Sequence, residues 1–137
     1  MGEYTKRRNV NRGYMKLEVW KEAVDLVRWL YALMGKHGAV DFKLRSQVLN
    51  AAQSISSNIA EGYCRRSIRE YLQFLNIALG SSGELMTRMI GFEIIEVVSK
   101  ESFEEFDNRH FSIENKLLAL TKSLQAKRRD GTWIEDL

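Results

Sequence analysis

The chain has 137 residues, a length that fits one domain, and it is 45% hydrophobic and 28% charged, as globular proteins commonly are. It contains no proline, which leaves long helices possible, and its single cysteine, Cys64, excludes an intramolecular disulfide. No apolar run is long enough for a membrane span and no signal-peptide pattern is present, so we expect a cytoplasmic protein without a membrane partner.

The formal net charge is +3, and the charges are distributed unevenly along the chain. Residues 1–16 contain five basic side chains and one acid, and residues 42–69 have the same balance. Residues 84–114 contain eight acids and three basic side chains. A chain polarised in this way can present a positive face to an anionic partner, although solvated faces of both signs are common on helical bundles.

The first predicted helix begins at Leu17 and ends at the glycine-containing segment 35–38. Its apolar residues recur at intervals of three and four, which is typical of an amphipathic helix with a wide buried face. Trp29 falls on the polar side of this helix, so we interpret it as a contact residue for another molecule.

The second predicted helix runs from about Asp41 to about Glu61, with Gly62 as its terminator. Asn58 and Glu61 lie three residues apart and therefore on one face. An acid and an amide without a nucleophile, a histidine or a metal make a poor active site. We interpret both as structural groups that satisfy the backbone of the following turn or of a neighbouring subunit.

The third predicted helix opens with a capping box formed by Ser67 and Glu70. Its first half is apolar on nearly every side because Tyr71, Phe74 and Ile77 add to the core stripe, so we expect its outer face to meet another subunit. Two glycines in its interior predict a close approach of another helix at that point, and these are Gly80 and Gly83.

The fourth predicted helix begins near Ser99 or Ser102 and ends at three consecutive cations, residues 127–129, which are favourably placed for the helix dipole. His110 lies on its apolar stripe, where we expect a hydrogen-bonded core histidine rather than a metal ligand. The prediction is an all-α, antiparallel up-and-down four-helix bundle over residues 17–127, between a basic arm of residues 1–16 and a short tail of residues 128–137.

Several segments together resemble one family of proteins: residues 17–20 (LEVW), 57–62 (SNIAEG), 70–75 (EYLQFL) and 78–81 (ALGS). The chain resembles the four-helix-bundle proteins first met as products of intervening sequences in bacterial large-subunit ribosomal RNA genes. This resemblance implies a homopentameric barrel. It also implies kinship with accessory proteins of diversity-generating retroelements, which bind nucleic acid and a reverse transcriptase through a positive surface.

We therefore expect an oligomeric protein that binds RNA or DNA largely by charge, with no cofactor or metal. The expected contacts are the cations of the second basic segment, supplemented by a flexible arm: Lys43, Arg45, Arg65, Arg66 and Arg69, with Arg7, Arg8 and Arg12. The alternative is a protein-interaction scaffold that uses Trp29 and the apolar face of the third helix. An enzyme is disfavoured, because there is no phosphate-binding loop and no histidine near Cys64.

Overall fold

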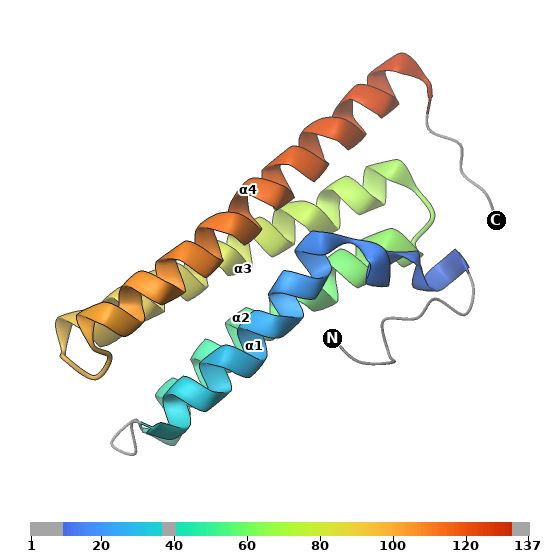
Figure 1. The fold of residues 1–137 in the computed structure, drawn as a ribbon. Coiled ribbons are helices and arrows are strands. Elements are labelled where there is room, and N and C mark those ends of the chain that lie inside the picture. The colour runs from blue at the N-terminus through green and yellow to red at the C-terminus, as the bar shows by residue number, and fades with distance from the viewer. Residues whose placement is uncertain (1–9, 37–40, 133–137) are drawn as a thin grey trace.

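The computed structural model describes residues 10–36 and 41–132, and these form one short helix and four long ones, with no strand among them (Figure 1). This confirms the predicted all-α class. The elements are the 3₁₀-helix η2 (Val10–Lys16) and the α-helices α1 (Glu18–Lys36), α2 (Phe42–Cys64), α3 (Ile68–Ile94) and α4 (Lys100–Asp130). The predicted nucleic-acid contacts Arg7 and Arg8 lie outside the described residues.

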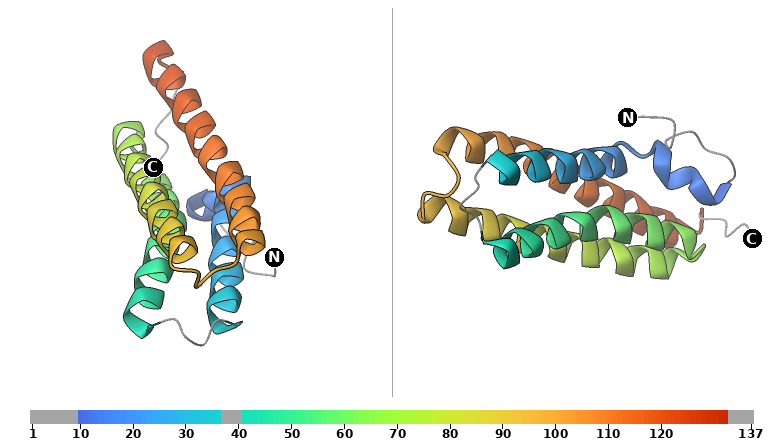
Figure 2. Two further views of the ribbon diagram at one scale, coloured as in Figure 1. Left: turned by 90° about the vertical axis from the view of Figure 1, so that its left-hand side faces the viewer. Right: turned by 90° about the horizontal axis from the view of Figure 1, so that it is seen from below.

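Successive helices run in opposite directions, and each packs on its neighbours, so that α4 returns to α1 (Figure 2). Hydrogen bonds between helices define the register of α3 against its two neighbours, α2 and α4. Ser54 of α2 bonds Ser81 of α3 through their hydroxyls at 2.7 Å, and His110 of α4 bonds the Ser82 hydroxyl at 2.8 Å. The last turns of α4 extend past the start of α1 and run beside the first turns of α3 (Figure 1).

Three helices begin where polar side chains cap their free backbone N–H groups. The side chains of Asp41, Ser67 and Ser99 accept from backbone N–H groups of the first turns of α2, α3 and α4. At the other end of α4, Gly131 adopts the left-handed conformation with φ 69°, which suits a residue without Cβ. The caps at Ser67 and Ser99 confirm the predicted starts of the third and fourth helices.

Side chains from all four α-helices form one hydrophobic core. Its largest fully buried members include Phe106, Leu26, Leu30, Met34, Ile55, Ile59, Leu75, Leu85, Met89, Ile113 and Leu117. His110 is buried among them, and its Nε2 lies 2.8 Å from both the hydroxyl and the carbonyl oxygen of Ser82. The prediction of a hydrogen-bonded core histidine is confirmed.

The prediction that Gly62 terminates the second helix is wrong. Helix α2 continues to Cys64, and the chain turns afterwards at Arg66, whose φ is 61°. A Cβ on Gly62 would lie 2.7 Å from Cβ of Phe74 and 3.1 Å from Cδ1 of Tyr71, closer than packed atoms tolerate. Glycine is therefore required here because α2 and α3 approach one another closely, and not because the helix ends.

The close approach predicted at Gly80 and Gly83 is absent within the described part of the chain. A Cβ built on either glycine meets no atom within 4 Å, because both residues lie on the outer side of α3. Close approach of α3 to another helix occurs instead at Gly62, on its flank toward α2.

The predicted basic arm is partly structured, because residues 10–16 form η2 and pack on the end of α2. The Tyr14 ring contacts Trp20 and Tyr63 edge-on, at centroid distances of 5.5 and 6.1 Å. Arg66 donates to the Asn11 side chain at 3.1 Å, which ties η2 to the α2–α3 turn. Within the described residues, no helix is long and apolar enough to cross a membrane.

Candidate nucleic-acid interface

The basic residues predicted between positions 42 and 69 do not form one patch. Helix α2 places Lys43 and Arg45 at its start and Arg65 just beyond its end. Twenty residues of α-helix separate Arg45 from Arg65, which corresponds to about 30 Å. This segment therefore contributes cations to both ends of the bundle and not to one continuous surface.

Lys43 and Arg45 lie at the acidic end of the molecule. The start of α2 lies beside the second half of α3, where Arg88 donates to the Gln47 side chain at 2.9 Å. The second half of α3, the turn after it and the first half of α4 carry the acids of residues 84–114. A polyanion at this end would meet those carboxylates as well as the two cations, so these two positions are weak candidates for phosphate contacts.

At the α2–α3 turn, two of the predicted contact residues already have partners within the chain. Arg65 donates to Glu61 at 2.9 Å, lies 3.5 Å from Glu70, and covers the Phe74 ring at 5.1 Å from its centroid. The hydrogen bond that Arg65 donates to Glu61, together with the negative charges of Glu61 and Glu70, raises the pKa of Arg65. Arg66 bonds Asn11. Both guanidinium groups are thus partly committed to holding the turn.

Arg69 belongs to a different arrangement, a groove between the first turns of α3 and the last turns of α4. This groove has a volume of about 600 Å³, and we call it the basic groove. Its lining residues are Arg69, Leu72, Gln73, Asn76, Gln125, Arg128 and Arg129. No acid is among them, and all three arginines are exposed. Because α3 and α4 are antiparallel, cations distant in sequence meet at one end of the bundle.

Arg128 and Arg129 were not named as candidate contacts in the sequence analysis, which placed them only at a helix end. Their contribution depends on the α3–α4 register, which local patterns do not define. The signal that could have identified them was the run of three cations at residues 127–129, combined with the predicted antiparallel order of the helices. The acid nearest to them, Asp130, lies 3.8 Å from Arg129 across an exposed pair, which stabilises little.

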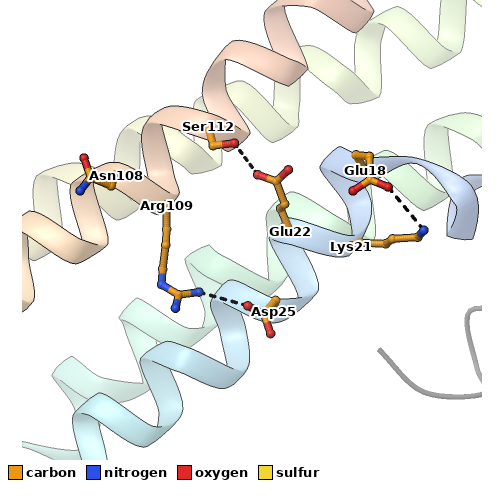
Figure 3. A pocket seen from close by; sticks show the side chains of 7 residues that line it. All are labelled: Glu18, Lys21, Glu22, Asp25, Asn108, Arg109 and Ser112. Atoms are coloured by element: carbon orange, nitrogen blue, oxygen red, sulfur yellow. Dashed lines mark hydrogen bonds and ion pairs between the residues drawn. The ribbon is translucent and has the colours of Figure 1, made fainter.

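A second groove, of about 550 Å³, lies between α1 and α4, and we call it the acidic groove (Figure 3). Its lining residues are Glu18, Lys21, Glu22, Asp25, Asn108, Arg109 and Ser112. Arg109 reaches from α4 to Asp25 at 3.1 Å, and the Ser112 hydroxyl donates to Glu22 at 2.6 Å (Figure 3). Lys116 also pairs with Glu22. These cross-helix pairs hold α1 against α4, and we interpret the groove as structural.

Three of the four predicted subunit contacts are covered within the chain itself. Trp29 is half-buried, with the Arg109 guanidinium 5.2 Å from its ring centroid, so it is not a free surface residue. Tyr71 is only 4% exposed, and its burial raises the pKa of its hydroxyl. Phe74 is half-buried beneath Arg65. Only Ile77, at 50% exposure, stands open on α3 as predicted.

Asn58 and Glu61 have structural partners in the described residues. The Asn58 amide donates to the Ser54 carbonyl at 2.7 Å and to its hydroxyl at 2.9 Å. Because the Ser54 hydroxyl also bonds Ser81, this chain of bonds links α2 to α3. Glu61 pairs with Arg65. Both side chains thus have hydrogen-bond or ion-pair partners that fit a structural role.

Cys64 is exposed, and its Sγ lies 3.3 Å from the carbonyl oxygen of Asn11. Partial burial raises the pKa of its thiol, and the positive charge of Arg66 opposes this effect only in part. A raised thiol pKa disfavours the reactive thiolate. Among the residues that the structure describes, no group of three or more acids, histidines or cysteines is placed to hold a metal ion.

A family model described as 23S rRNA-intervening sequence protein matches residues 15–119. The matched range covers α1, α2, α3 and the larger part of α4. It contains Arg69 but stops short of Arg128 and Arg129, so one wall of the basic groove lies beyond it. No curated protein matches the chain.

Proposed function

Because the chain belongs to the 23S rRNA-intervening sequence protein family, we propose that it is a non-enzymatic, oligomeric protein that binds nucleic acid by charge. The observation that carries this proposal is the basic groove, where Arg69, Arg128 and Arg129 are exposed around a concave surface lined by no acid. Guanidinium groups match phosphate geometry and remain charged at any physiological pH.

Other cations at the same end extend this surface. Arg12 is exposed on η2, and the bond between Arg66 and Asn11 places η2 beside the α2–α3 turn. Lys127 is exposed on the last turn of α4. Arg65 and Arg66 add positive potential even though their hydrogen bonds are directed within the chain. Phosphate neutralisation needs only cations at tolerable spacing, so this surface supports affinity with little dependence on sequence.

We propose that the outer face of α3 and α4 forms the subunit contact. Ile77 of α3 is 50% exposed, and Phe111 and Leu118 of α4 are 60% and 51% exposed. Phe111 and Leu118 are seven residues apart and therefore share one face of α4. Leaving such side chains in water forgoes roughly 1.5–3 kcal/mol of burial for each. Five subunits is the number implied by the resemblance to the family.

Oligomerisation would repeat the basic groove around the assembly. Several weak sites on one polyanion bind with an avidity that exceeds single-site affinity by orders of magnitude, provided that the geometry allows simultaneous contact. The expected behaviour is a steep loss of affinity as salt rises, with log K roughly linear in log salt concentration.

The test is a salt-titrated fluorescence anisotropy assay with RNA, DNA and a polyglutamate competitor, together with light scattering to establish the assembly. We expect binding of both nucleic acids at low salt and a mass several times 15.9 kDa. Absence of binding to either nucleic acid at low salt, with the assembly intact, would refute the nucleic-acid function.

A second candidate function, a scaffold for a protein such as a reverse transcriptase, is favoured by a different surface. Phe42 and Ile94 are 75% and 74% exposed at the end of the bundle away from the basic groove. Apolar side chains concentrated at such a site are characteristic of protein contacts. This function predicts a protein complex that is lost in Phe42→Glu and kept in Arg69→Glu, which is the reverse of the pattern expected for nucleic acid.

A further inference from the structure

We infer that the basic groove takes an unpaired nucleotide from a single-stranded region, with its carboxamide side chains contacting the edge of the base. This inference rests on the proposed function and specifies the class of nucleic acid. The observation behind it is the composition of the groove. Besides the three arginines, the lining contains three carboxamides and one apolar side chain: Gln73, Asn76, Gln125 and Leu72.

A surface that only neutralises phosphates needs cations, and carboxamides add nothing to its charge. Each carboxamide does offer two N–H donors and a carbonyl acceptor, a combination that base edges also present. Asparagine and glutamine side chains form paired hydrogen bonds with adenine in protein–DNA complexes. Three such groups around one concave surface therefore fit a heterocyclic base better than a second phosphate.

The order of the lining residues along each wall agrees with this assignment. On α3, Arg69 stands one helical turn before Gln73 and two turns before Asn76, so all three share a face. On α4, Gln125 precedes Arg128 by three residues, and Arg128 lies nearer the end of the helix. Both walls thus carry guanidinium groups toward the end of the bundle and carboxamides one or two turns further in, which corresponds to about 5 to 11 Å. A phosphate at the mouth and its own base inside would match this order.

The shape of the groove favours an unpaired base over a duplex. Its volume of about 600 Å³ leaves room for one nucleobase, although the groove is open to solvent and does not enclose a ligand. Leu72, only 9% exposed, gives it an apolar lining against which a base face can lie. In a double helix, RNA base edges lie within grooves that side chains read poorly, whereas unpaired bases can splay outward and offer their edges. Only the splayed base can enter a concave site.

The test compares one fluorescein-labelled 15-nucleotide RNA without self-complementarity with the same strand annealed into a duplex. The variant carries Asn76→Ala and Gln125→Ala, both at exposed positions. A matched control carries Gln53→Ala and Asn115→Ala, which remove two exposed amides outside the groove. Neither variant changes the net charge.

We expect the wild-type protein to prefer the single strand, and the groove variant to lose roughly 5- to 30-fold in single-strand affinity, as for one lost paired base contact. Its duplex affinity and the salt dependence of binding should not change, because no cation has been removed. The control variant should behave as wild type. Arg69→Gln should instead weaken both complexes and reduce the salt slope by about one.

Two outcomes overturn the inference and are distinguishable from a failure of the proposed function. If the groove variant keeps the wild-type preference for the single strand, or loses affinity equally for both forms, the carboxamides do not contact a base, and electrostatic binding stands. If the wild-type protein binds neither RNA at low salt, the proposed function fails together with the inference.

Discussion

Helix α3 has two flanks that differ in how fully their polar side chains are paired with partners in the same chain. On the flank toward α2, the Ser54 and Ser81 hydroxyls bond one another, Arg88 bonds Gln47, and Gly62 lets the two helices touch. On the opposite flank, the first turns of α3 meet the end of α4 across the basic groove, whose exposed cations face no lining acid.

This difference distinguishes polar side chains that hold two helices together from polar side chains that are free to bind another molecule. Both flanks carry arginines, and composition alone does not distinguish them. On the α2 flank, Ser54 and Gln47 are hydrogen-bonded to side chains of α3, so a substitution there should change stability. In the basic groove on the α4 flank, exposed cations are held close together at an electrostatic cost, so replacing one of these cations should change binding and leave stability nearly unchanged.

The largest effect is expected from reversing charge in the basic groove. The pair Arg69→Glu and Arg128→Glu should reduce RNA affinity roughly 100-fold at 100 mM salt, because two phosphate contacts become repulsions. The matched control is Lys43→Glu with Arg45→Glu, which changes net charge by the same amount at the other end of the bundle. The RNA affinity of that control, measured by fluorescence anisotropy, should fall by no more than about threefold. Equal losses in the two pairs would show that net charge, and not the groove, governs binding.

On the α2 flank, Gly62→Ala should destabilise the protein by about 1–3 kcal/mol, since its Cβ would collide with the backbone-anchored Cβ of Phe74. The collision outweighs the gain of roughly 1 kcal/mol that alanine brings to a helix interior. Urea unfolding at fixed protein concentration measures the change. The folded fraction should bind RNA as wild type does, and unaltered stability would mean that α2 and α3 are further apart than the structure places them.

A smaller loss is expected for Asn58→Ala, at about 1 kcal/mol, because it breaks the chain of hydrogen bonds from Asn58 through Ser54 to Ser81. The neighbouring exposed residue Gln53 provides a control, since Gln53→Ala should leave the thermal midpoint within error. If Asn58→Ala keeps the wild-type melting temperature but no longer binds RNA, Asn58 has a role in binding and not in stability.

The segment 57–62, one of those that carry the family resemblance, thereby acquires a structural explanation. Asn58 bonds across the seam through Ser54, Ile59 is fully buried, Glu61 pairs with Arg65, and Gly62 permits the contact with α3. Its residues are those that the α2–α3 contact requires. The exposed cations of the basic groove, which we propose as the phosphate contacts, lie outside it.

Local patterns were sufficient to predict the four long helices, the caps at Ser67 and Ser99 and the buried position of His110, because spacing and capping are encoded within a few turns. They did not reveal that Arg128 joins Arg69, because that depends on the register between helices far apart in sequence. For the same reason they did not show that Trp29 is partly covered within the chain, since the guanidinium over its ring comes from Arg109 on α4. Periodicity predicts which face is buried but not which distant side chain covers a residue at its edge.

The smallest effect, and one of opposite sign, is expected on the outer side of α3. Gly80→Ala adds a Cβ that meets no atom of the chain within 4 Å. Alanine in a helix interior should therefore stabilise the dissociated subunit by about 0.5–1 kcal/mol, as judged from urea unfolding at the lowest usable concentration. Gly80 lies one turn from Ile77, within the face that we propose as the subunit contact, so the same methyl group should raise the dissociation constant of the assembly in sedimentation experiments. A variant that gains stability and assembles as wild type would place the subunit contact elsewhere. If the dissociated variant is less stable than wild type, the outer side of α3 is not open within one subunit. The contrast between a closely packed α2 flank and an open surface elsewhere on α3 would then be wrong.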